Sequence, residues 1–221
     1  MFKQPRFIAV LVCTSLMAFQ TLASQPPVNT PPTSDHMRLP LLAPDRLDVE
    51  QKRLYEDMKS NVPANFDAFK IISPTGAMFG PQNIWLTEPK YGRRIWELAF
   101  TMSKDTILPD EARQVTILAV GAHFNSAFEL YAHNAIARRA GMSEQRLSSL
   151  ATGTRPVDLS PTEAVAYDVT VGLLKGGPLP EPTYNLGVAT YGKDGMLELV
   201  YLVGLYSFVS TTLNAYDVKV P

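Results

Sequence analysis

LPDEARQVTILAVGAHFNSAFELYAHNAIARRAGMSEQRLSSL, residues 108–150, is the stretch that decides the fold. Pro109 followed by Asp110 and Glu111 is typical of a helix start, because proline fits the first turn and acidic residues suit the positive end of the helix. The residues that follow, 115–122, are almost all apolar. A helix that is apolar on every side is buried, so this stretch predicts a central core helix.

The second half of the stretch is also helical. Residues 125–140 continue the helical pattern, and Gly141 is a typical stop. Ser143 then begins a further short helix. Downstream, Ser160 and Glu163 have the spacing of a capping box, which predicts another helix start.

Helical patterns account for most of the remaining chain. The expected helices cover residues 48–61, 93–103, 164–174, 182–190 and 195–216. Residues 74–92 are rich in Gly and Pro, which predicts a long structured loop with a short helix at most. The last helix is apolar enough to be mistaken for a membrane span, but Ser207 and Ser210 favour a buried helix of a bundle or an oligomer. No segment alternates with the period of a strand, so the chain is expected to be all-α, with one domain over residues 46–221.

The first 23 residues have the pattern of a secretory signal peptide. Lys3 and Arg6 precede an apolar stretch that is too short to span a bilayer comfortably, and small residues precede a cut after Ala23. The alternative is an uncleaved membrane anchor. Residues 24–45 contain many prolines, which predicts an extended linker or an arm held on the surface. We therefore expect an exported protein, periplasmic or secreted, with no stable membrane insertion after cleavage.

Charge and cysteine content exclude several functions. The formal net charge is −1, which excludes the broad basic surface of a nucleic-acid-binding protein. The single cysteine, Cys13, excludes a disulfide framework, a Cys-rich zinc site and a CxxC redox pair. Because Cys13 lies in the predicted signal peptide, the mature protein has no thiol.

Ser126, Glu129 and His133 lie on one face of the helix predicted over residues 125–140. Glu129 and His133 are four residues apart, so their side chains can meet. A carboxylate raises the pKa of a neighbouring imidazole and orients it, which suits a general acid or base near neutral pH. The alternative is a solvated salt bridge on a helix surface.

Residues 108–150 resemble the core of the carboxymuconolactone decarboxylase family, which includes the AhpD-like alkyl hydroperoxidases. The shared pattern is a charged helix start, an apolar helix, E-x-x-x-H and A-x-x-A-G-M-S. The closing helix with its LNA…VP ending, and the loop over residues 74–92, are also similar to that family. The resemblance implies an AhpD-like helical bundle that forms a homo-oligomer, a trimer or hexamer. The apolar closing helix also favours an oligomer.

The departures from the family matter for activity. The peroxidase branch has C-x-x-C-x-x-x-H, whereas this chain has Ser126 and Glu129 at the two thiol positions. Peroxide reduction by thiols is therefore expected to be absent. Gln114 stands where the family often has Glu, and an amide does not take up a proton, so a relay from that position is not expected.

The decarboxylase branch implies a Glu and His pair that needs no cofactor. We expect His133 to donate a proton, Glu129 to orient it, and Ser126 or Tyr131 to donate a hydrogen bond to the developing oxyanion. The expected substrate is a small carboxylated lactone or a related enolisable acid. In the loop over residues 79–85, Phe79 and Trp85 would form pocket walls and Asn83 a polar contact, although simple core packing explains the two aromatic residues equally well.

His123 is a further candidate for substrate contact. If the helix is unbroken, His123 lies about 240° from Glu129, which makes a poor metal site, so no metal is expected. Tyr206 and Asn214 of the last helix could also reach a pocket. The alternative function is a secreted, non-catalytic binding or interaction module on the same fold.

Overall fold

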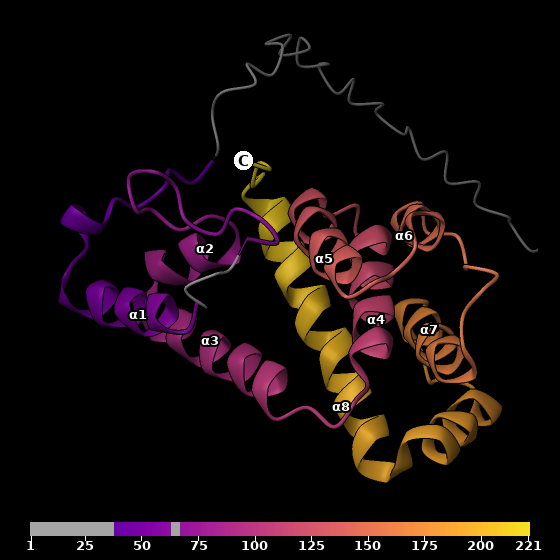
Figure 1. Ribbon diagram of the computed structural model, residues 1–221. Helices are drawn as coiled ribbons and strands as arrows, with labels where there is room; N and C mark the ends of the chain where they lie inside the picture. Colours follow the sequence, from indigo (N-terminus) through magenta and orange to yellow (C-terminus); the bar gives the residue numbers. More distant parts are fainter. Residues whose placement is uncertain (1–37, 63–66) are drawn as a thin grey trace, which may run out of the picture. The chain divides into compact units, whose positions relative to one another are not determined.

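The computed structural model describes residues 38–62 and 67–221, which lie in one compact unit. These residues form eight α-helices and a short 3-10 helix, with one isolated bridge between Ile72 and Met78 and no strand (Figure 1). The all-α prediction is confirmed. The helices are η1 (Pro44–Arg46), α1 (Val49–Ser60), α2 (Pro81–Thr87), α3 (Pro89–Lys104), α4 (Asp110–His123), α5 (Ala127–Arg139), α6 (Glu144–Ala151), α7 (Pro161–Leu174) and α8 (Glu181–Ala215). The predicted signal peptide lies outside the described residues.

Helix α4 is the central helix, as its composition predicted. All residues from Ala112 to Gly121 are buried, and α4 packs against α5, α6, α7 and α8 (Figure 1). The predicted capping box of α7 is present: the Glu163 backbone N–H donates to Ser160 Oγ, and the Ser160 N–H donates to Glu163 Oε2. The core therefore forms around α4, whose residues from Ala112 to Gly121 are buried on every side of the helix.

The chain turns sharply between α4 and α5. The sequence predicted that the second helical stretch starts at residue 125, and α5 begins at Ala127. Asn125 has a positive φ of 49°, and the N–H of Ser126 donates to the Gly121 carbonyl at 2.9 Å. Asparagine tolerates this left-handed conformation better than most residues. Because the helix is broken here, the angle calculated between His123 and Glu129 for one continuous helix does not apply.

Residues 74–92 are more helical than expected. Pro81 begins α2, Pro89 begins α3 four residues before the predicted start, and only one residue separates the two helices. At Gly92 a Cβ atom would lie 1.9 Å from the carbonyl oxygen of Trp85. A glycine is thus required where α2 and α3 approach each other, and this contact places both helices beside the cavity described below.

Helix α8 is bent at Gly192, whose φ of 73° and ψ of 176° are not helical. This bend separates the two helices that the sequence predicted over residues 182–190 and 195–216. The helix is long and apolar enough to cross a membrane, but 44% of its most apolar window is buried within the protein. Leu199, Leu202 and Leu213 belong to the main hydrophobic core. Helix α8 is therefore a core helix of the bundle.

The described part of the proline-rich segment is bound to the helical domain. The Asn83 carboxamide accepts a hydrogen bond from the Leu42 N–H at 2.9 Å and donates to the Pro40 carbonyl at 3.1 Å. Arg38 donates to the carbonyl of Ala215 at the end of α8. These bonds attach the segment to α2 and α8.

Candidate functional site

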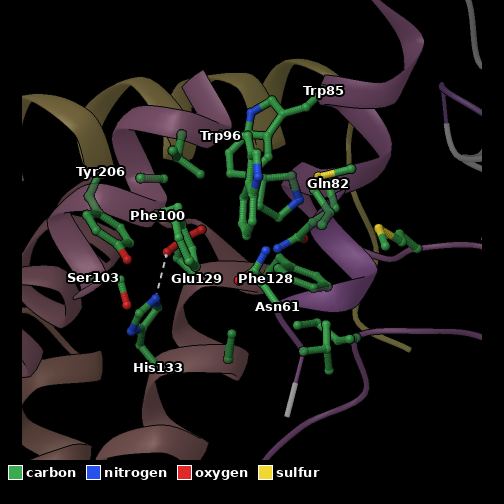
Figure 2. Close-up of a pocket in the computed structure, with 18 of the residues that line it drawn as sticks. Asn61, Gln82, Trp85, Trp96, Phe100, Ser103, Phe128, Glu129, His133 and Tyr206 are labelled. Atoms are coloured by element: carbon green, nitrogen blue, oxygen red, sulfur yellow. Dashed lines mark ion pairs between the residues drawn. The ribbon is translucent and has the colours of Figure 1, made fainter. Parts of the chain in front are cut away.

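A cavity of about 450 Å³ lies beside α5 and is lined by residues of α1, α2, α3 and α8 as well (Figure 2). We call it the aromatic cavity. Its aromatic lining consists of Phe69, Trp85, Trp96, Phe100, Phe128 and Tyr206. Its polar lining consists of Asn61, Gln82, Ser103, Lys104, Glu129 and His133. A mostly apolar cavity of this size with a few polar groups is typical of small-molecule sites.

Glu129 and His133 meet at the wall of the aromatic cavity, as their spacing predicted. Glu129 Oε2 lies 3.6 Å from His133 Nε2 (Figure 2). The Glu129 side chain is 5% exposed and that of His133 is 13% exposed. The pair is therefore not the solvated surface salt bridge considered from the sequence.

The other nitrogen of His133 is fixed by α4. Nδ1 of His133 lies 3.0 Å from Gln114 Oε1, and a neutral imidazole donates its Nδ1–H to this acceptor. The lone pair of Nε2 then faces Glu129. The ring of Tyr206 packs edge-on against the imidazole, with the ring centroids 5.1 Å apart. Gln114 thus leaves Nε2 as the unprotonated nitrogen of His133, facing the carboxyl group of Glu129.

Burial moves the two pKa values in opposite directions. It raises the pKa of Glu129 from 4.5 to about 8. Burial and the nearby charge of Arg113 lower the pKa of His133 to about 3. The expectation that the carboxylate raises the pKa of His133 is therefore wrong, because the loss of hydration on burial is the largest effect on His133 and lowers its pKa. Both shifts favour the uncharged forms of the two groups, with the proton on Glu129.

Besides Oε2 of Glu129, two polar atoms in the cavity lining are buried without a hydrogen-bond partner. They are Nε1 of Trp85 and Oε1 of Gln82, both from α2. A buried donor or acceptor without a partner costs about 1–3 kcal/mol. Such unpaired groups in a cavity wall are available to a ligand.

Ser126 does not share the site. It is the N-cap residue of α5, is fully buried, and is not among the residues that line the aromatic cavity. Its Oγ has no hydrogen-bond partner. The helix begins only after this residue, so the projection that placed Ser126 with Glu129 and His133 fails at the first turn. A role for Ser126 in holding a substrate oxyanion is not supported by this position.

Four other predicted substrate contacts lie outside the lining of the aromatic cavity. The Tyr131 hydroxyl accepts a hydrogen bond from the backbone N–H of Lys70. Asn83 binds the proline-rich segment, and Phe79 lines a small hollow beside that segment. His123 is exposed at the end of α4. Of the loop residues proposed as pocket walls, only Trp85 lines the aromatic cavity.

Sequence reasoning missed most of the cavity wall. Trp96 and Phe100 are four residues apart on α3, and this spacing is equally typical of a core helix. Gln82 gave no signal at all. Tyr206 was considered from the sequence and does line the cavity. Asn214, considered with it, instead donates to the Phe124 carbonyl and ties the end of α8 to the turn before α5.

No group of three or more His, Cys, Asp or Glu side chains in residues 38–62 and 67–221 is arranged to hold a metal ion. The described residues also contain no cysteine. Glu129 and His133 form a titratable pair at the cavity wall, and proton transfer is a reaction that such a pair can carry out.

Comparison with known proteins supports the fold. The sequence matches no protein family model and no curated protein. Among solved structures, the chain is similar to a protein of unknown function from Agrobacterium tumefaciens, whose description suggests an antioxidant defence protein of the AhpD type. The match has a TM-score of 0.58 and 13% sequence identity, and covers 63% of this chain and 96% of that one. The chain therefore has the all-helical fold of AhpD-like proteins.

Proposed function

We propose that the protein is a cofactor-independent acid–base enzyme that decarboxylates a small, enolisable carboxylic acid, such as a β-keto acid or a carboxylated lactone. The observation that carries this proposal is the Glu129 carboxyl group, which is buried, has its pKa raised by that burial, and lies 3.6 Å from His133 at the wall of a cavity. A pKa near the working pH is what general acid catalysis requires.

The proposed reaction begins with loss of CO₂ from the bound carboxylate. The electron pair of the broken C–C bond moves into the adjacent carbonyl group and forms an enolate. Apolar walls favour this step, because the charge of the carboxylate is poorly solvated there and becomes delocalised as CO₂ leaves. Lys104 is an exposed residue of the described cavity lining. Its cationic group can attract the incoming acid.

Glu129 then donates its proton to the carbon that carried the carboxylate. The products are CO₂ and the protonated substrate carbon, and Glu129 is left ionised. Its negative charge now favours protonation of His133 at Nε2, the nitrogen that faces it. A proton from solvent can therefore return to Glu129 through the imidazole. These roles reverse those expected from the sequence, where His133 was the donor.

The thiol peroxidase activity of the AhpD type is not part of this proposal. The only cysteine of the chain, Cys13, lies in the predicted signal peptide. Reduction of a peroxide by this route needs a thiolate, so export and cleavage would leave a protein without the nucleophile. A non-catalytic binding module on the same fold is the second candidate, and the aromatic cavity is the observation that favours it.

The test measures CO₂ release from a panel of β-keto acids and carboxylated lactones. We expect Glu129→Gln to lower kcat by about 10²–10⁴-fold, the usual contribution of a general acid. His133→Ala should lower kcat at least about tenfold by interrupting proton return. Wild-type activity should decrease as pH rises through about 8, because Glu129 then loses its proton before the reaction.

Glu56→Gln is the matched control, since it makes the same chemical change at an exposed residue of α1. It should retain wild-type kcat. A loss below about threefold for Glu129→Gln corresponds to well under 1 kcal/mol and would remove Glu129 from the role of proton donor. No CO₂ release from any member of the panel by the folded protein would leave the binding module as the better explanation.

A further inference from the structure

Helix α2 presents one unpaired hydrogen-bond donor and one unpaired acceptor at the aromatic cavity. Trp85 is 5% exposed, and its Nε1–H has no acceptor; Oε1 of Gln82 has no donor. The two residues are three positions apart in the helix, so they lie on the same face. Figure 2 shows both among the side chains that line the cavity. A ligand that meets α2 therefore needs an acceptor for the Nε1–H of Trp85 and a donor for Oε1 of Gln82.

The aromatic side chains beside this pair favour a flat ligand. The rings of Trp85 and Trp96 have their centroids 6.3 Å apart, and those of Trp96 and Phe100 are 5.3 Å apart with an angle of 34° between the planes. These contacts form a continuous run of ring surfaces from α2 to α3. Ring compounds pack well against such surfaces in offset or edge-on arrangements.

The electrostatics of the wall favour an uncharged ligand body. Of the titratable groups in the described lining, burial raises the pKa of Glu129 and of Tyr206 and lowers that of His133, which favours their uncharged forms, and Lys104 is on an exposed residue. A charge buried against this wall would have no partner, which is costly. The ring of the ligand therefore carries dipoles rather than a charge where it meets α2.

We infer that α2 is the recognition element of the site, and that the aromatic cavity binds a flat ring compound carrying a carbonyl oxygen next to an N–H or O–H group. The Nε1–H of Trp85 donates to the carbonyl oxygen, and the N–H or O–H of the ligand donates to Gln82 Oε1. The inference rests on the proposed function in one respect: in an enolisable substrate this carbonyl oxygen gains negative charge, so Trp85 would also stabilise the enolate.

The test uses three bicyclic probes of similar shape in equilibrium dialysis. 2-Quinolone carries a ring carbonyl and an adjacent N–H, coumarin has the carbonyl with a ring oxygen in place of the N–H, and naphthalene has neither. Each is measured with the wild-type protein and with Trp85→Phe, Gln82→Met and Gln145→Met. Gln145 lies exposed on α6 and provides the matched control for the glutamine change. Binding needs no turnover, so this result is independent of whether CO₂ is released.

We expect Trp85→Phe to weaken binding of 2-quinolone and coumarin at least fivefold, and that of naphthalene less than twofold. Gln82→Met should weaken 2-quinolone at least fivefold and leave coumarin within twofold, and Gln145→Met should change none of the three. If Trp85→Phe weakens the binding of all three probes by the same factor, Trp85 only packs against the ligand and the inference is overturned. So would the absence of 2-quinolone binding to the wild-type protein. If Trp85→Phe does not fold, the contrast between 2-quinolone and coumarin in Gln82→Met decides alone.

Discussion

The carboxyl group of Glu129 makes folding depend on pH in a direction opposite to that of most acidic residues. Its pKa is about 8 in the folded protein and near 4.5 in the unfolded chain. Above pH 4.5 the unfolded chain therefore releases this proton first, and stability decreases until pH 8. His133 has the reverse effect between pH 6.5 and 3, because its folded pKa is about 3. The two effects cancel between pH 4.5 and 6.5, so this pair favours folding most in that window.

This balance gives a prediction for the Glu129→Gln protein. Between pH 6.5 and 8 only the Glu129 effect remains, so the wild-type free energy of unfolding should decrease by about 1–2 kcal/mol more than that of Glu129→Gln. Urea titrations at pH 5.5, 6.5 and 8 measure the difference. Glu56→Gln, at an exposed position, should follow the wild-type profile. Parallel profiles for wild type and Glu129→Gln would show that Glu129 ionises normally in the folded protein.

At the scale of single residues, the sequence predicted the contact between Glu129 and His133 but not their protonation. The contact depends only on helical spacing within α5, which is local. The protonation depends on burial by neighbouring helices and on the charge of Arg113, from α4. No pattern within residues 125–140 contains that information.

At the scale of helices, local signals predicted most boundaries well. The capping box at Ser160 and the positive φ of 97° at Gly141 are properties of a few adjacent residues, and both lie where the sequence placed them. The start of α3 was predicted four residues late, because the Gly and Pro content of residues 74–92 was interpreted as a loop. There Pro81 and Pro89 begin helices instead of ending them.

The part of the cavity wall that comes from α2, α3 and α8 could not be predicted, because it depends on how these helices pack together. Gln82 and Trp96 come from two helices whose close approach depends on one glycine. Leu205 comes from α8, more than seventy residues beyond His133 in the chain. A site assembled from helices far apart in sequence is determined by tertiary packing, which periodicity does not report.

The approach of α2 and α3 gives a prediction for Gly92. A methyl group there would lie 1.9 Å from the Trp85 carbonyl oxygen, a backbone atom that cannot move without displacing α2. We expect Gly92→Ala to destabilise the protein by about 3 kcal/mol, seen as a lower Tm, and to weaken ligand binding in the aromatic cavity. Ser148→Ala is the control, because it introduces an alanine at an exposed position of α6, and its Tm should not decrease. Equal Tm values for the two variants would show that α2 and α3 can separate at no cost.

At the scale of the whole molecule, one face of α8 remains uncovered. Leu197, Tyr201 and Phe208 are 50%, 58% and 45% exposed and lie within about 40° of each other around the helix. Large apolar side chains aligned in this way commonly mark an interface. The homo-oligomer expected from the sequence, a trimer or hexamer, therefore stays a prediction, with this face of α8 as the contact.

Light scattering after size-exclusion chromatography measures the predicted assembly. The wild-type protein should have the mass of an oligomer, and Tyr201→Glu combined with Phe208→Glu should shift it to the monomer, because burying two carboxylates in an apolar contact is costly. Tyr184→Glu makes the same type of change at an exposed tyrosine before the bend of α8 and should leave the mass unchanged. A wild-type monomer at micromolar concentration would contradict the prediction.

The chain has two tryptophans, and both line the aromatic cavity. The tryptophan fluorescence of the native protein therefore comes from this one place, without any label. Its emission wavelength reports whether water fills the cavity, and energy transfer or quenching reports an occupant. Because Trp85 and Trp96 lie close together, a ligand between the helices should alter both at once. Protein-free extracts can thus be screened for a ligand by the change in this emission.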